Sequence, residues 1–120
     1  MDDDTLKMTM LFDFFGELLT EKQREYFDLY HNEDLSLSEI AEKTGITRQG
    51  VYDIIARAER SLDEMERKTG VIRRWEETRE GLAKAGALAK ELLRLSGGTG
   101  EAADVARRLV AVLEELGARE

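Results

Sequence analysis

The sequence predicts an all-α protein, with a helix-turn-helix core followed by long C-terminal helices. Apolar residues recur at steps of three and four along most of the 120 residues, which is the period of an amphipathic helix. Proline, the residue that most disrupts helices, does not occur. Residues 37–55 have the spacing of two crossed helices, with small Ala41 at the crossing, Gly45 at the turn and apolar Val51 six residues later.

A first helix is expected over about residues 6–15, and Gly16 ends it or bends it. Thr20 and Gln23 then form the pattern of a capping box, which starts a second helix that runs to about Tyr30. The expected apolar residues of these two helices are Met10, Leu11, Phe14, Phe15, Leu18, Tyr26, Phe27 and Tyr30. Residues 31–34 are expected to form a polar loop in which His31 faces solvent.

The two helices of the motif have clear start and stop signals. Ser36 and Glu39 form a second capping box, which predicts a helix over about 37–44. Gly45 follows as a C-terminal cap, because glycine readily takes a positive φ. Thr47 is expected to cap the next helix, which has no stop signal before Gly70.

Two further helices are expected over about 71–95 and 101–116, joined by the glycine-rich linker 96–100. Each carries an apolar stripe at steps of three and four. The expected stripe residues are Val71, Trp75, Thr78, Leu82, Ala85, Ala89 and Leu92 in the first, and Ala102, Val105, Leu109, Val112 and Leu116 in the second, widened by Ala106, Val110 and Leu113. We therefore predict a helix-turn-helix domain over 1–70 and a helical extension over 71–120 that serves a homodimer.

Composition limits the classes of protein that need to be considered. There is no cysteine, which excludes disulfides and thiolate-bound zinc. No apolar run is long enough to span a membrane, and the acidic start is unlike a signal peptide, so a cytoplasmic protein is expected. The formal net charge is −8. Residues 1–35 hold 10 acidic and 3 basic residues, whereas residues 36–61 hold 4 of each, so any basic patch is local to the motif.

The candidate contact residues lie on the motif and just after it. In a reader of duplex DNA, Arg48 can pair with guanine and Gln49 with adenine, although both also fit a solvated helix start. Tyr52 could stack on a base or be half-buried. The full set of predicted nucleic-acid-binding residues is Lys43, Thr47, Arg48, Gln49, Tyr52 and Arg57.

Three acidic residues and one glycine bear on this surface. Arg57 and Arg60 either face phosphates or pair with nearby carboxylates, and pairing is favoured for Arg60. The carboxylates within reach are Asp53, Glu59 and Glu64. A glycine inside a helix, such as Gly50, costs about 1 kcal/mol relative to alanine. We interpret Gly50 as easing the crossing of its helix over Ala41. The alternative is that Gly50 allows the backbone of a partner to approach closely.

Catalytic patterns are lacking in the sequence. His31 is the only histidine, adjacent glutamates such as Glu76 and Glu77 diverge on a helix, and no phosphate-binding glycine loop occurs. We therefore expect no enzyme, no cofactor and no metal site.

Residues 5–75 resemble the YlxM/p13-like family of small bacterial helix-turn-helix proteins. The segments that carry the resemblance are residues 11–15, 18–26, 35–42, 47–55 and 57–62, above all the Arg-Gln-Gly-Val-Tyr-Asp string that starts at Arg48. The same region is similar to region four of sigma factors, through its Leu-Thr-Glu-Lys-Gln-Arg and Ser-Leu-Ser-Glu-Ile-Ala segments. The resemblance implies a sigma-like helical core and a link to the signal recognition particle pathway.

Three functions are compatible with these observations. The first is a regulatory or accessory factor of the signal recognition particle, which binds its RNA, its GTPase or both. The second is a DNA-binding transcriptional regulator that resembles sigma-factor region four. The third is an adaptor that uses the motif to bind protein alone.

Overall fold

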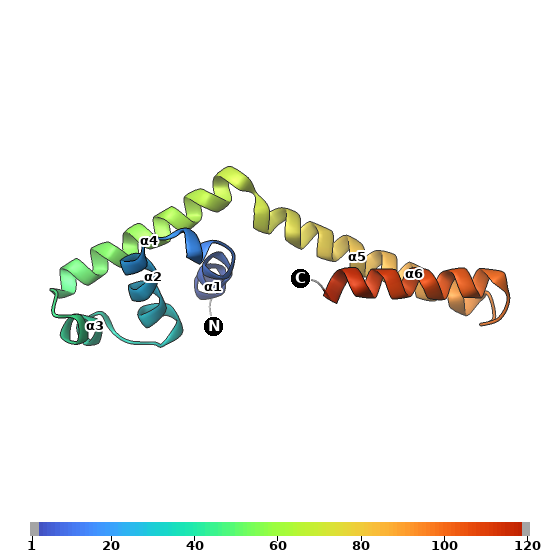
Figure 1. The fold of residues 1–120 in the computed structure, drawn as a ribbon, viewed down its shortest axis with the longest axis horizontal. Helices are drawn as coiled ribbons and strands as arrows, with labels where there is room; N and C mark the ends of the chain where they lie inside the picture. Colours follow the sequence, from blue (N-terminus) through green and yellow to red (C-terminus); the bar gives the residue numbers. More distant parts are fainter. Residues whose placement is uncertain (1–2, 119–120) are drawn as a thin grey trace. The chain divides into compact units, whose positions relative to one another are not determined.

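The computed structural model describes residues 3–118 and divides the chain into two compact units, one up to Ile72 and one from Arg73 onward. Met1 and Asp2, which begin the acidic start noted above, lie outside the described residues. The described part of the chain is entirely helical, without a strand, which confirms the predicted fold class. Its helices are α1 (Asp3–Phe15), α2 (Glu21–Phe27), α3 (Leu37–Thr44), α4 (Arg48–Thr69), α5 (Val71–Leu95) and α6 (Glu101–Ala118) (Figure 1).

The predicted caps place the helix boundaries of the first unit. The Thr20 hydroxyl accepts the Gln23 N–H at 3.1 Å, and the Gln23 side chain accepts the Thr20 N–H at 3.2 Å. Ser36 and Glu39 make the same reciprocal pair at 3.1 and 2.9 Å. Gly45 ends α3 at φ 80° and Gly70 ends α4 at φ 64°, so both glycines take the left-handed conformation that a helix stop requires.

Helix α4 contributes side chains to both apolar clusters of the first unit. The cluster beside α1 comprises Leu11, Phe15, Leu19, Phe27, Ala58, Leu62 and Ile72. The cluster beside α3 comprises Tyr26, Leu29, Ile40, Val51 and Ile55. Phe27 is fully buried, and its ring stacks on that of Phe12 with 4.7 Å between the ring centroids. Because Val51, Ile55, Ala58 and Leu62 all face these clusters, the opposite side of α4 is left to solvent.

Three expectations about the first unit are wrong, and each fails where the chain leaves the regular α-helix. Leu18 is 69% exposed, and Leu19 is buried instead, because a 3-10 turn over Gly16–Leu18 rotates the chain. Tyr30 is exposed and Leu29 is buried, because α2 continues as a π-helix over Asp28–Asn32. The same π-helix turns His31 inward, where it lies against the Phe27 ring and bonds to Glu59 at 2.6 Å.

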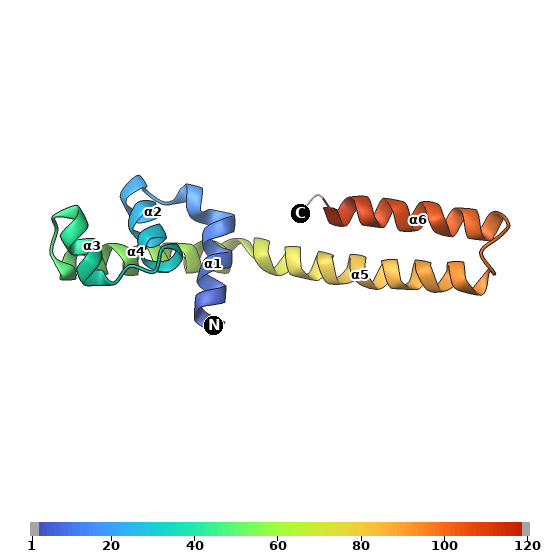
Figure 2. The same ribbon diagram turned by 90° about the horizontal axis from the view of Figure 1, so that it is seen from below.

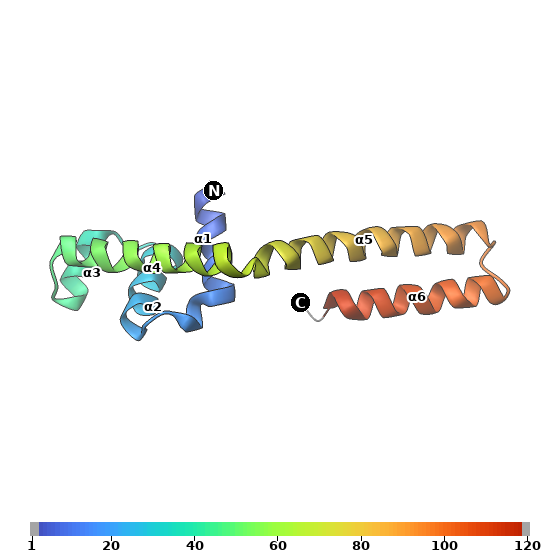
Figure 3. The ribbon, with the colours of Figure 1, turned by 90° about the horizontal axis from the view of Figure 1, so that it is seen from above.

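The second unit is a hairpin in which α5 and α6 run side by side in opposite directions (Figures 2 and 3). Gly97, Gly98 and Gly100, in the predicted linker, all have positive φ. The residues buried within 73–118 are all alanines, namely Ala89, Ala103 and Ala106. Of the expected stripe residues, Ala89 is buried, whereas Thr78 and Leu92 of α5 and the strict stripe of α6 are exposed in the single chain. No helix in the described part of the chain is long and apolar enough to cross a membrane.

Candidate nucleic-acid interface

Helix α4 begins directly after a turn in which Thr47 caps the helix. Thr47 has extended backbone angles, and its hydroxyl accepts the Gly50 N–H at 3.0 Å. The left-handed Gly45 directs the chain into this turn, and a Cβ added there would meet nothing within 4 Å. Gly45 is thus required for its backbone conformation. The free N–H groups of the first turn make such a helix start favourable for anions.

Gly50 has a different explanation from the one expected. A Cβ added at Gly50 would lie 3.1 Å from the Thr47 hydroxyl oxygen and 3.6 Å from Cδ1 of Ile46, and Ala41 is not among the atoms within 4 Å. The interpretation that Gly50 eases the crossing over Ala41 is therefore wrong. The glycine leaves room for the hydroxyl that caps α4.

Four of the six candidate residues gather at this end of α4. Thr47, Arg48, Gln49 and Tyr52 are all exposed, and 53% of Tyr52 is accessible to solvent. Lys43 is exposed on the last turn of α3, which ends just before the turn into α4. This surface therefore joins a cation from each motif helix with a flat aromatic ring that bases or a partner chain can contact.

Gln49 is engaged within its own helix. Its side-chain amide nitrogen donates to Oδ1 of Asp53 at 3.0 Å. Paired hydrogen bonds to adenine need that amide, so Gln49 has to leave Asp53 before it can read a base. Asp53 itself is exposed and adds a negative charge beside the candidate surface.

Arg57 lies apart from the other five residues. It follows Arg48 by nine residues, and at about 100° per residue that separation is half a turn, so the two arginines emerge on opposite flanks of α4. Arg57 instead borders a surface hollow of about 540 Å³ together with Gln23, Arg60, Ser61, Glu64, Met65 and Lys68. The candidate residues thus form a group at the helix start and a second basic group midway along α4.

The nearby carboxylates are engaged by residues other than Arg57 and Arg60. Asp53 accepts from Gln49, and Glu59 bonds to His31. Glu64 pairs with Arg67 at 2.9 Å and with Lys68 at 3.2 Å. Hydrogen bonds from these two cations, Arg67 first, hold the pKa of Glu64 below its usual range.

These bonds leave two exposed guanidinium groups without a carboxylate. Among the described residues, Arg57 and Arg60 have no ion pair within 4 Å. The expectation that Arg60 is paired is therefore wrong. Sequence analysis missed this because the competing partners, Arg67 and Lys68, are as close along the helix to Glu64 as Arg60 is. Two unpaired cations on the solvent side of α4 are available to phosphates.

Within the described residues no group of three or more histidine, cysteine, aspartate or glutamate side chains could hold a metal ion. The surface presents exposed cations, one exposed aromatic ring and helix-start N–H groups, which bind anions and planar rings. The exposed carboxylate of Asp53 beside them repels anions.

Comparison with known proteins gives consistent matches to one group. Residues 2–91 match the model of the family UPF0122, described as "Putative helix-turn-helix protein, YlxM / p13 like". The UPF0122 protein of Thermoanaerobacter sp. (strain X514) is 48% identical over 84 residues, which cover 70% of this chain and 72% of that protein. The UPF0122 protein of Bacillus thuringiensis (strain Al Hakam) is 45% identical over 91 residues, which cover 76% and 83% of the two chains.

Proposed function

The chain belongs to the YlxM/p13-like helix-turn-helix family, UPF0122, and from this premise we propose that it is a cytoplasmic regulatory or accessory factor of the signal recognition particle. In this proposal it binds the RNA of the particle, its GTPase or both, through the exposed side of α4. A helix-turn-helix suggests nucleic-acid binding in general terms. The link to this particle rests on the family resemblance described above.

The observation that carries the proposal is the set of exposed cations along α4 and at the end of α3, with Tyr52 beside those at the start of α4. Arg48 and Lys43 flank the start of α4, and Arg57 and Arg60 have no carboxylate within 4 Å among the described residues. RNA is bound through phosphates and through unpaired bases stacked on aromatic rings, and these are the groups that this surface offers.

The charge balance favours such a mixed target over tight binding to a long duplex. Residues 1–72 hold 17 acidic and 9 basic residues, so a rigid duplex lying along this unit would bring its phosphates near many carboxylates. A folded RNA presents a shorter anionic surface, and a bound GTPase can contact acidic regions. We propose a binding protein without enzymatic activity of its own.

The proposal is tested by fluorescence anisotropy with the purified full chain at two salt concentrations. The labelled targets are the signal recognition particle RNA, the same RNA with its GTPase bound, and a random DNA duplex. Preferential binding to either RNA form, weakened by salt, supports the proposal. Equal binding to the duplex, or no binding to any target, overturns it.

Two variants locate the contact surface in the same assay. Arg48→Ala should weaken RNA binding about ten- to hundredfold, because a lost charge-assisted hydrogen bond contributes about 1.5–3 kcal/mol. Arg67→Ala is the matched control, since it makes the same charge change on the same helix, at a side chain that pairs with Glu64. Equal losses in both variants would mean that only the overall charge matters.

The alternative function is a DNA-binding transcriptional regulator. The exposed Arg48 and Gln49 at the start of the second motif helix favour it, because these side-chain types pair with guanine and adenine. For this function, Gln49→Ala should reduce discrimination at one base pair. Asp53→Asn should strengthen binding, because it removes a negative charge next to the duplex.

We also propose that the chain acts as a homodimer. The support is the three-four spacing of apolar residues along α5 and α6.

A further inference from the structure

The C-terminal hairpin exposes an unusual number of large apolar side chains. Seven of them, between 43% and 71% accessible to solvent, are Leu88, Leu92, Leu95, Val105, Leu109, Val112 and Leu116. In the part of this unit that the structure describes, residues 73–118, the buried residues are three alanines. Monomeric proteins rarely expose contiguous apolar surface of this kind, and where they do it marks a site of interaction.

The exposed residues share one face of the hairpin. In α5, Leu88 comes one residue before buried Ala89. In α6, Val105 comes one residue before buried Ala106, and Val112 comes one before half-buried Leu113. The same step of one residue therefore separates the exposed stripe from the packed side in both helices. A step of one residue is a rotation of about 100° around the helix axis. The two facing, antiparallel helices are related by a two-fold axis perpendicular to the plane that contains them. The same rotation in each helix therefore brings both stripes to the same face of the hairpin.

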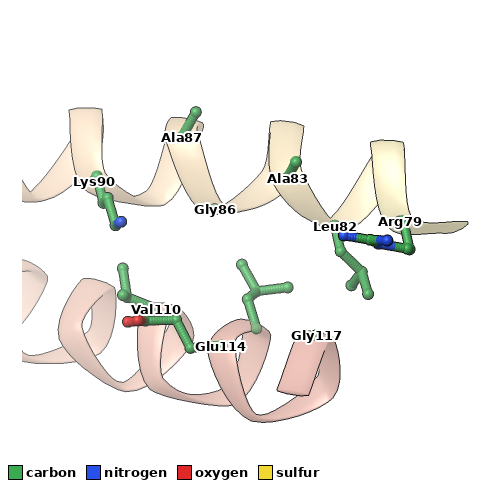
Figure 4. A pocket seen from close by; sticks show the side chains of 10 residues that line it. Arg79, Leu82, Ala83, Gly86, Ala87, Lys90, Val110, Glu114 and Gly117 are labelled. Atoms are coloured by element: carbon green, nitrogen blue, oxygen red, sulfur yellow. The ribbon is translucent and has the colours of Figure 1, made fainter. Parts of the chain in front are cut away.

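The other side of the hairpin has a different character. A groove between α5 and α6 is lined there by residues that come one position after the packed ones, among them Ala83, Lys90 and Glu114. Figure 4 shows this groove, with Arg79 and Lys90 on α5 and Glu114 on α6. The hairpin thus has one polar, grooved face and one apolar face.

We propose that the apolar face of the hairpin binds the same face of a second copy of this chain, so that two hairpins form a four-helix bundle. Charge favours a copy as the occupant: residues 73–120 hold 9 acidic and 9 basic residues, so two hairpins carry no net repulsion. Among residues 3–72, the first unit offers no matching stripe, because the exposed large apolar residues there, Leu6, Leu18, Tyr30 and Tyr52, lie on separate elements.

Most of this surface lies beyond the family match, because Leu88 is the only one of its seven large apolar side chains within residues 2–91. The inference specifies the homodimer included in the proposed function and does not depend on which nucleic acid is bound. It is tested without nucleic acid, so its failure is distinct from a failure of the proposed function.

The test is sedimentation equilibrium of the full chain over a hundredfold range of concentration. The wild type should form a dimer, and the double variant Leu109→Gln, Val112→Gln should be a monomer over the same range. Ala111→Gln is the matched control, because Ala111 is exposed on the same helix but points away from the stripe. A monomeric wild type, or a double variant that still dimerises, overturns the proposal.

Discussion

The helix-turn-helix unit and the C-terminal hairpin differ in where they place their large apolar side chains. The first unit buries Phe27, Leu11 and Leu62 almost completely. The hairpin buries only alanines and exposes its leucines, although its apolar residues follow the same three-four spacing. The two units also differ in formal charge, because residues 1–72 carry the whole excess of acidic residues. Helical periodicity therefore identifies an apolar face without telling whether that face closes a core or binds a partner.

The largest expected effect comes from removing the centre of the first core. Phe27→Ala should destabilise the first unit by about 3–5 kcal/mol, because it deletes a fully buried ring that stacks on Phe12. Urea denaturation followed by circular dichroism measures the loss. Leu109→Ala is the matched change in the hairpin, and at concentrations where the chain is monomeric it should cost less than about 1 kcal/mol. Equal losses would remove the distinction between the two units.

Local signals in the sequence were sufficient to predict the helix boundaries of the motif. The Ser36 and Glu39 box, Gly45, Thr47 and Gly70 each act within one helical turn, so their effect depends on neighbours that are adjacent in the sequence. The exposure of Tyr52 did not follow from these signals, which left this residue either exposed or half-buried. Arg48 comes seven residues before buried Ile55 and so lies on the same face of α4, but it is exposed because it is the first residue of the helix.

Packing between distant segments could not be predicted in the same way. Leu18 and Leu19 are equally apolar, and a 3-10 turn decides which of them is buried. His31 faces inward because a π-helix brings it to Glu59, 28 residues away. In α6 the packed face is displaced by one residue from the strict stripe, because small Ala103 and Ala106 allow a closer approach to α5 than leucine does.

A smaller effect is expected from adding one methyl group to a glycine in each unit. Gly45→Ala should destabilise the first unit by about 1–2 kcal/mol, because the new Cβ has room but the backbone is left-handed. Gly86→Ala should instead stabilise the hairpin by up to about 1 kcal/mol, since Gly86 is inside α5 and a Cβ there also meets nothing within 4 Å. Thermal denaturation measures both changes, and opposite signs are the expected result. A Gly45→Ala variant as stable as the wild type would show that the turn tolerates an alanine, and a destabilising Gly86→Ala would contradict the expectation for α5.

The smallest expected effect is the dependence of the first unit on pH through the cap of α3. The Ser36 backbone N–H, and then its hydroxyl, lower the pKa of the Glu39 carboxyl. A carboxyl whose pKa is lower in the folded chain stabilises the fold above its ordinary value of about 4.3, and that contribution is lost as pH falls through the lowered value. Glu39→Gln keeps an acceptor for the Ser36 N–H but removes the charge. The wild type should therefore be more stable than Glu39→Gln at pH 6, and the difference should vanish as the pH falls through the lowered pKa of Glu39.

A control variant at a second glutamate on α3 distinguishes the effect of the cap from the effect of the overall charge of the unit. Glu42→Gln makes the same charge change on the same helix, at an exposed position away from the cap. Urea denaturation of all three proteins across this pH range decides whether the effect belongs to the cap. If the two variants differ from the wild type equally at every pH, the charge of Glu39 contributes only to the overall acidity of the unit.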